Sequence, residues 1–198
     1  MAEETFRIRV RGLVDADQAD EQVDGVEHLP VCMIENLLLA PESIFEYMQG
    51  VARDTFADSD AVRDELRSIA TEMRSKEITL RLRRRLKPKL VRLSGATVDE
   101  IKASLVEQVA GVQAILPSDD RLNEIVAETT AAVDAIIAAD QQLDQFRGKE
   151  LLNTFYQRHV AALNIGYNPM CIDLARIVAQ RQQVAARLDP VFDRLIAD

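Results

Sequence analysis

Tryptophan is absent from this 198-residue chain, and aromatic residues make up only 5% of it. A core must therefore be built from Leu, Ile, Val and Ala, as is usual in helical proteins. Glycine and proline are also scarce, at 7 and 6 residues, while hydrophobic residues reach 47%, which excludes collagen-like and low-complexity chains. The length allows one domain, or one domain with a helical annex.

Long apolar runs and closely spaced cysteines are missing as well. No stretch approaches the roughly 20 apolar residues of a membrane span, and the first residues are acidic rather than basic and then apolar. We therefore expect a soluble, cytoplasmic protein with no membrane partner. Cys32 and Cys171 lie far apart with no histidine at metal-ligand spacing, so the sequence indicates neither a disulfide framework nor a zinc site.

Positive charge is concentrated in one segment. The net charge is −9, but residues 76–92 hold eight Lys or Arg and one Glu, a local charge of +7 that leaves −16 for the rest. Such a segment could follow a nucleic-acid backbone. Its lack of aromatic residues for base stacking argues against recognition of single strands. The candidate nucleic-acid contacts are Arg81, Arg83, Arg84, Arg85, Lys87 and Lys89.

Other interpretations of this basic segment stay open. A charge run on a helix is usually a solvated face. The segment could also dock on the acidic surface of its own chain or on a partner protein, because the remainder of the molecule is strongly negative.

Apolar periodicity predicts strands only near the amino end. Residues 6–14 alternate apolar and charged side chains, the pattern of a strand with one solvated face, and an acidic loop follows. A second short strand is expected at 26–31, where Pro30 belongs at a strand end or sheet edge. Because two strands do not make a stable sheet alone, they need further strands or a covering helix.

Helical periodicity begins at Met33 and continues toward the carboxyl end, which predicts about seven helices. One amphipathic helix starts near Val62 and is expected to continue until Pro88 stops it. Thr97 and Glu100 have the spacing of a capping box at the start of a later helix. The Ala-rich helices that follow are expected to pack as antiparallel hairpins.

The stretch from Gly12 to Asp17 carries the most informative chemical signal. A strand that ends in Asp15 and Asp17 places two carboxylates at the carboxyl edge of a sheet, where open α/β sheets bind ligands. Carboxylate oxygens suit Mg²⁺, which takes one or two of them and keeps waters that a phosphate can displace. The same spacing also fits a solvated acidic turn.

Two blocks of the chain resemble TOPRIM-type proteins. Residues 11–48 read RGLVDADQADEQVDGVEHLPVCMIENLLLAPESIFEYM. This is similar to a family segment in which a strand ends in Asp-x-Asp, a second strand follows, and LP-x-x-x-IENLLL precedes a Pro-initiated helix. Residues 146–152, FRGKELL, and the tail LARIVAQRQQVAARLDPVFDRLI are similar to later helices of the same family. The resemblance covers roughly residues 7–50 and 143–198.

The family in question is a TOPRIM-like domain-of-unknown-function family. Its members accompany ABC-type and AAA-type ATPases or are fused to them, as in overcoming-lysogenization-defect nucleases and related phage-defence systems. The resemblance therefore implies a metal-dependent nuclease that uses Mg²⁺ or Mn²⁺ and works with an ATPase domain or subunit on DNA or RNA.

The resemblance also implies roles for individual residues. Asp15 and Asp17 correspond to the metal-binding catalytic pair, and Glu35 would be a further catalytic carboxylate. Lys149, at a helix start preceded by glycine, would reach a phosphate, and Asn36 would hold backbone groups. Apart from the family, Glu35 also fits as an acid that complements the dipole of a helix first turn, and Lys149 as a solvated residue.

A TOPRIM site also needs a glutamate at the end of an earlier strand, and only fourteen residues precede Asp15. We therefore expect either the carboxyl-terminal portion of a longer protein or a degenerate copy without catalysis. The expected fold is an α/β start, with a partial TOPRIM-like parallel sheet, followed by a predominantly α-helical region. Its parts are a TOPRIM-like segment at 1–50, a helical annex with the basic helix at 51–145, and helices at 146–198 that pack back on the first segment.

A hypothesis from a different functional class is a non-catalytic helical module for protein interaction or assembly. An exposed sheet edge is a template for another strand, and long Ala-faced helices suit association, including a homo-oligomer. Metal binding and oligomeric state would distinguish this hypothesis from the nuclease.

Overall fold

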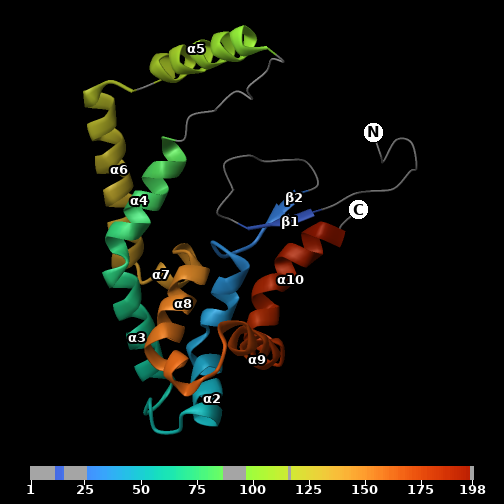
Figure 1. The fold of residues 1–198 in the computed structure, drawn as a ribbon. Helices are drawn as coiled ribbons and strands as arrows, with labels where there is room; N and C mark the ends of the chain where they lie inside the picture. The colour runs from blue at the N-terminus through green and yellow to red at the C-terminus, as the bar shows by residue number, and fades with distance from the viewer. Residues whose placement is uncertain (1–11, 16–25, 87–96, 116, 197–198) are drawn as a thin grey trace. The chain divides into compact units, whose positions relative to one another are not determined.

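The computed structural model describes residues 12–15, 26–86, 97–115 and 117–196 and is mostly helical (Figure 1). The elements of the first half are β1 (Gly12–Val14), β2 (Val26–His28), the 3-10 helix η2 (Ile34–Leu39), α2 (Pro41–Val51), α3 (Ser59–Glu72) and α4 (Arg74–Arg85). Those of the second half are α5 (Val98–Ile115), α6 (Asp119–Ala138), α7 (Gln142–Gln145), α8 (Gly148–His159), η3 (Ala161–Leu163), α9 (Tyr167–Ala179) and α10 (Gln182–Ile196).

The chain divides into two compact units. Unit 1 combines Met1–Met73 with Ile136–Asp198, and unit 2 is the intervening segment Arg74–Ala135. The helical annex expected at 51–145 stays a prediction, and unit 2 covers only part of that range. Helices α2 and α3 belong to unit 1 together with the carboxyl-terminal helices.

The two strands form a short parallel pair in unit 1. Gly12 lies opposite Val26 and Val14 opposite His28, so the pairing covers three residues of each strand. β2 is shorter than the strand expected at 26–31, because proline at position 30 cannot donate to a strand ladder. Residues 6–11 lie outside the described residues, and a wider TOPRIM-like sheet stays a prediction.

Helix α10 covers the strand pair. Nε of Arg194 donates to Oε2 of Glu27 on β2 at 2.8 Å. Leu188 of α10 packs against a buried cluster of Leu29, Val31 and Leu37, which follows β2 along the chain. The covering helix supplies the apolar contacts that an isolated two-stranded pair lacks.

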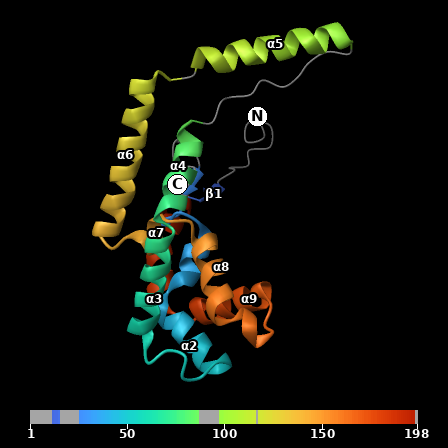
Figure 2. The same ribbon diagram turned by 60° about the vertical axis from the view of Figure 1, so that its left-hand side comes forward.

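The core of unit 1 is formed mainly by α2, α3, α8 and α9 (Figure 2). The apolar face predicted to begin at Val62 is confirmed, since Val62, Leu66 and Ile69 of α3 are completely buried. Leu151 and Phe155 of α8 are equally inaccessible. Each such side chain contributes about 1.5–3 kcal/mol through its removal from water.

The single helix predicted between Val62 and Pro88 is wrong, because α3 ends at Glu72 and α4 begins at Arg74. Met73 caps α3, and its N–H still donates to the carbonyl of Ile69. The interruption coincides with the boundary between the two units. The two helices therefore belong to different units, although the apolar repeat continues from one helix into the next.

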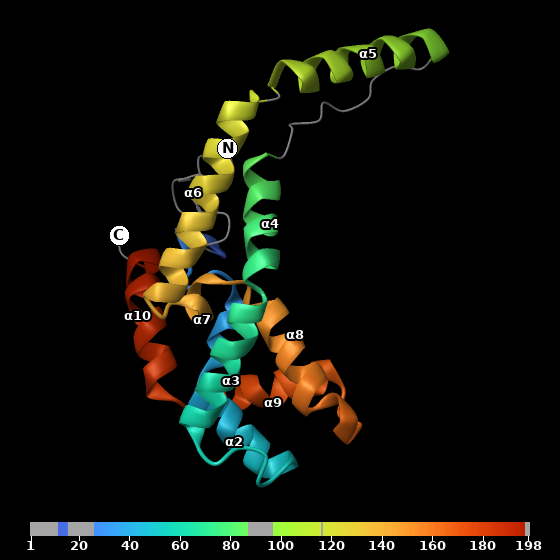
Figure 3. The same ribbon diagram turned by 90° about the vertical axis from the view of Figure 1, so that its left-hand side faces the viewer.

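Helices α4 and α6 of unit 2 lie side by side (Figure 3), and arginine side chains join them. Arg74 donates to both carboxylate oxygens of Asp134, at 2.6 and 2.8 Å. Arg85 donates to Oγ1 of Thr129 at 3.0 Å and to Oε2 of Glu128 at 2.6 Å. The contacts between these helices therefore include two ion pairs, Arg74 with Asp134 and Arg85 with Glu128.

Helix α5 begins with the predicted capping box. Thr97 N–H donates to Oε2 of Glu100 at 3.0 Å, and Glu100 N–H donates to Oγ1 of Thr97 at 3.3 Å. However, Val98, Val106 and Val109 of α5 are 57–70% exposed. These side chains do not take part in the packed hairpin that the sequence suggested. Among the described helices, none combines the length and the apolar character needed to cross a membrane.

Candidate metal and phosphate site

Asp15 directly follows β1 and reaches the start of η2. Its side chain is half-buried, and Oδ1 accepts a hydrogen bond from the Ile34 N–H at 3.1 Å. The carboxylate thus satisfies a free N–H at the beginning of a helix, next to Glu35 in the chain. Asp17, the second member of the predicted metal pair, lies outside the described residues.

Asn36 joins η2 to the segment around the start of α8. Its Nδ2 donates to the carbonyls of Leu143 and Phe146 at 2.7 and 2.8 Å. Its Oδ1 accepts from the N–H groups of Met33 and Gly148 at 2.8 and 3.2 Å. The side chain is only 3% exposed, and all its donors and acceptors are used. The prediction that Asn36 holds backbone groups is confirmed.

These contacts bring three predicted site segments together. Glu35 is half-buried and lies between two residues that make these contacts. The N–H of Ile34 donates to Asp15, and Oδ1 of Asn36 accepts from the N–H of Gly148. Lys149 follows Gly148 in the first turn of α8 and is exposed. The end of β1, the start of η2 and the start of α8 therefore meet at one junction. The 112 residues between Asn36 and Gly148 are bridged by a direct hydrogen bond.

The donor set at this junction suits a hard cation. Asp15 and Glu35 are carboxylates, and Mg²⁺ in proteins commonly binds one or two carboxylates together with several waters. Within the described ranges, no group of three or more His, Cys, Asp or Glu side chains is placed to hold a metal ion. Asp15 and Glu35 therefore fit in chemical type, and a complete ligand set needs further oxygen donors.

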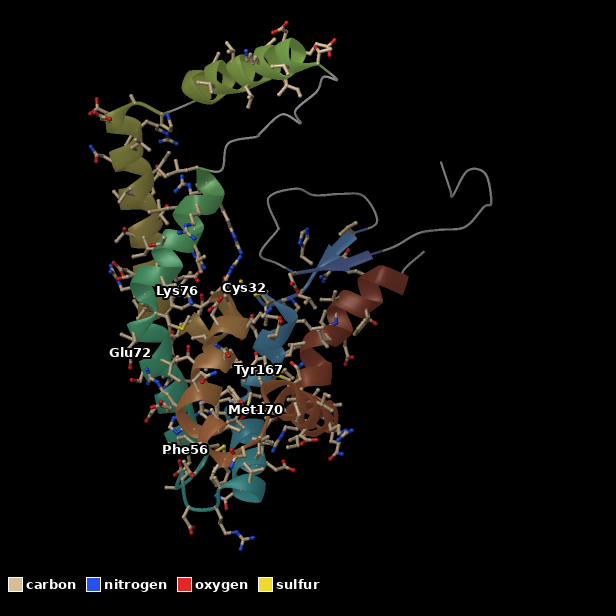
Figure 4. The ribbon with its side chains drawn as sticks, in the orientation of Figure 1. Cys32, Phe56, Glu72, Lys76, Tyr167 and Met170 are labelled. Carbon is tan, nitrogen blue, oxygen red and sulfur yellow. The ribbon has the colours of Figure 1, made fainter. Side chains whose placement is uncertain are left out.

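Tyr167, which Figure 4 labels, and Cys171 lie close enough to Glu35 to be influenced by its charge, and sequence reasoning missed this neighbourhood. Burial raises the pKa of the Tyr167 hydroxyl, and the nearby Cys171 and Glu35 act in the same direction. Burial also raises the pKa of the Cys171 thiol, although the nearby Tyr167 hydroxyl opposes this. Cys171 is therefore a protonated neighbour of the junction at neutral pH and a poor nucleophile.

The basic helix α4 is partly neutralised by carboxylates of its own unit. Nε of Arg81 donates to Oε1 of the buried Glu77 at 2.7 Å, and Arg85 is paired with Glu128. These contacts support the interpretation that the segment docks on acidic residues of its own chain. Arg83 and Arg84 are exposed. Lys87 and Lys89 lie outside the described residues.

A contact between His159 and Glu65, which the sequence did not indicate, occurs in unit 1. Nε2 of His159 lies 3.0 Å from Oε1 of Glu65, which also accepts from Arg158 at 3.2 Å. The rings of Phe56 and Phe155 flank His159, with centroids 5.1 and 4.9 Å from it. The two partners are 94 residues apart, so no local pattern could have revealed this contact.

Comparison with protein-family models, curated proteins and solved structures found no significant match for this chain. The resemblance to TOPRIM-like proteins therefore stays a prediction from the quoted motifs. The geometry contributes one independent observation, namely that the two resembling blocks pack together within unit 1.

Proposed function

We propose that this chain supplies part of a TOPRIM-like, Mg²⁺- or Mn²⁺-dependent nuclease site and works with an ABC- or AAA-type ATPase. The observation that supports this most is the position of Asp15. It follows a strand of a parallel pair, and its carboxylate is fixed against the start of η2 beside Glu35. Ligand sites of open α/β sheets lie at this end of parallel strands.

The residues at the junction have separate roles in this proposal. Oδ1 of Asp15 is fixed by the Ile34 N–H, which leaves Oδ2 for a cation, and Asp17 and Glu35 supply further oxygens. A bound Mg²⁺ would polarise the phosphodiester and neutralise its developing charge. Lys149, exposed on the first turn of α8, would hold a non-bridging phosphate oxygen. A further glutamate from a longer chain or from a partner subunit would complete the set.

The proposal predicts that Asp15→Asn combined with Asp17→Asn abolishes metal binding and cleavage without unfolding the protein. Asparagine keeps an oxygen that accepts from the Ile34 N–H but removes the charge that attracts the cation. Isothermal titration with Mg²⁺ and Mn²⁺ measures binding. Cleavage of plasmid DNA and of RNA, with the ATPase present, measures activity.

The matched control removes two exposed carboxylates of unit 2 by Asp99→Asn and Asp120→Asn. This control should retain metal binding and cleavage. Undiminished cleavage by the Asp15 and Asp17 variant would show that the two residues form only an acidic turn.

A second candidate function is a helical module for assembly, and the exposed apolar side chains of α5 favour it. Ile101, Leu105 and Val109 recur at a spacing of four and are 39%, 45% and 57% exposed. Apolar residues at this spacing lie along one face of a helix. Such a face commonly packs on another helix when a partner is available.

This second function predicts a loss of self-association on replacing Leu105 and Val109 by glutamate. The two charges lie on the apolar face of α5 and would be buried in any helix pair that uses it. Ala103→Glu with Ala110→Glu adds the same charge to the opposite face and should have no effect. Size-exclusion chromatography with light scattering, at low and high salt, measures the mass. A monomer in the parent protein at high concentration would exclude this function.

A further inference from the structure

A pocket of about 210 Å³ lies within unit 1, where η2 continues into α2 and where α3, α7 and α10 approach. Asp15, Glu35 and Lys149 do not line it. Its polar lining is provided chiefly by three arginines and two aspartates from four different segments. These residues are Arg63, Arg67, Asp140, Asp144 and Arg187.

The three guanidinium groups are held in place by carboxylates. Arg63 donates to Glu42 at 2.9 Å and also to Asp60. Arg67 pairs with Asp140 and, at 3.3 Å, with Asp64. Their side chains are 33% and 37% exposed, so they are fixed in position without being sealed from a ligand.

Arg187 approaches from α10 and donates to Oδ1 of Asp144 at 2.8 Å. Its side chain is 40% exposed. A guanidinium carries five N–H donors, whereas the hydrogen bonds among the described residues occupy two on Arg63, two on Arg67 and one on Arg187. Most of the N–H donors of these three arginines are therefore not used by hydrogen bonds within the described part of the chain.

The carboxylates that line the pocket are those of Asp140 and Asp144. Oδ2 of Asp140 accepts from Arg67, and Oδ1 accepts from Nε2 of Gln142 at 3.2 Å. Three arginines and two aspartates line the pocket, while the other carboxylates that pair with these arginines, Glu42, Asp60 and Asp64, are not among its lining residues. The start of α2 also borders the pocket through Ala40 and Pro41, and the positive end of the helix dipole adds to the potential there.

An excess of guanidinium donors over acceptors selects a ligand that is rich in negatively charged oxygen. Phosphoryl groups have this property and bind arginine through paired, charge-assisted hydrogen bonds. The pocket volume corresponds to about seven water molecules at about 30 Å³ each, which leaves room for more than one phosphoryl group.

We propose that this pocket is a binding site for a phosphoryl oxyanion, held by Arg63, Arg67 and Arg187. The ligand is either an inorganic phosphate or pyrophosphate, or the phosphate end of a nucleotide. The site goes beyond the nuclease proposal, since it uses none of the predicted metal or catalytic residues. It can exist whether or not the junction of Asp15 and Glu35 binds a metal.

The test is titration of the intact chain with phosphate, pyrophosphate and ADP in separate experiments, without divalent cations and at constant ionic strength set by chloride. Binding is followed by calorimetry and by the shift in melting temperature. Pyrophosphate binding without a gain for ADP identifies an inorganic ligand, whereas tighter binding of ADP identifies a nucleotide. Absence of binding by all three overturns the proposal.

Arg67→Gln and Arg187→Gln should each weaken binding at least tenfold, because each removes a charged donor group. Arg176→Gln is the matched control, since Arg176 is exposed on α9 and pairs with its near neighbour Asp173 at 2.9 Å. Equal affinity in all three variants contradicts the proposed site.

Asp144→Asn separates a binding role from general destabilisation. The substitution removes a negative charge from the pocket and weakens the pairing of Arg187, although an oxygen that can accept from it remains, so it should increase affinity severalfold. The main-chain carbonyl of residue 144, which accepts from the Cys32 N–H at 2.8 Å, is retained. Weaker binding by this variant would overturn the assignment even if the arginine variants prove unstable.

Discussion

Replacement of Asn36 by alanine is expected to lower the free energy of unfolding by about 3–5 kcal/mol, one of the two largest effects we predict. The substitution removes three hydrogen bonds that join η2 to the segment containing Leu143, Phe146 and Gly148, and a fourth with the Met33 N–H at the start of η2. Each buried backbone group left without a partner costs about 1–3 kcal/mol, and water entry recovers part of this cost. Urea denaturation followed by circular dichroism measures the change.

Asn153→Ala provides the matched control for this prediction. Asn153 lies in α8, like the segment that Asn36 holds, but its side chain is exposed. Alanine favours the helix slightly, so the stability should stay within about 0.5 kcal/mol of the parent. A loss below about 1 kcal/mol for Asn36→Ala would mean that the hydrogen bonds at the junction contribute little.

The helix starts that depend on local chemistry could be predicted from the sequence. The reciprocal bonds of Thr97 and Glu100 form as their spacing indicates, and Ser118 Oγ accepts from the Arg121 N–H at 3.3 Å. These interactions join residues three positions apart. Such short-range patterns keep the same meaning in most folds.

The boundary at Met73 could not be predicted in the same way. The apolar repeat continues through it, but α3 packs into unit 1 and α4 into unit 2. Periodicity shows that a helix has an apolar face and does not show which element covers that face. The discontinuous composition of unit 1, which the chain leaves at Met73 and re-enters at Ile136, is likewise a tertiary property.

The sequence predicted the types of residue in the candidate site. It predicted their spatial arrangement only in part. The sequence indicated Asp15, Glu35, Asn36 and Lys149 as separate positions. It could not show that Oδ1 of Asp15 accepts a hydrogen bond from the Ile34 N–H, 19 residues away. Nor could it reveal the pocket arginines, because Arg67 and Asp140 are 73 residues apart and each resembles an ordinary surface charge.

The second large effect is expected for Gly148→Ala, which should lower the free energy of unfolding by about 2–4 kcal/mol. A Cβ atom at this position would lie 2.5 Å from the backbone nitrogen of Asn36 and 2.7 Å from its Oδ1. The backbone nitrogen cannot rotate away, so α8 must move from η2. The bond from the Gly148 N–H to Asn36, 3.2 Å long, would be stretched or lost.

Gly50→Ala should raise the free energy of unfolding, although it is the same chemical change in the same unit. Gly50 lies in α2, and a Cβ there would meet no atom within 4 Å. Alanine in a helix is favoured over glycine by about 0.5–1 kcal/mol, so this variant should be more stable than the parent. Urea denaturation of both variants measures the contrast. Similar stability of Gly148→Ala and Gly50→Ala would show that η2 and α8 do not approach as closely as the structure indicates.

If the close approach is correct, Asn36→Ala should partly relieve the Gly148→Ala clash, so that the combined loss is smaller than the sum of the single losses.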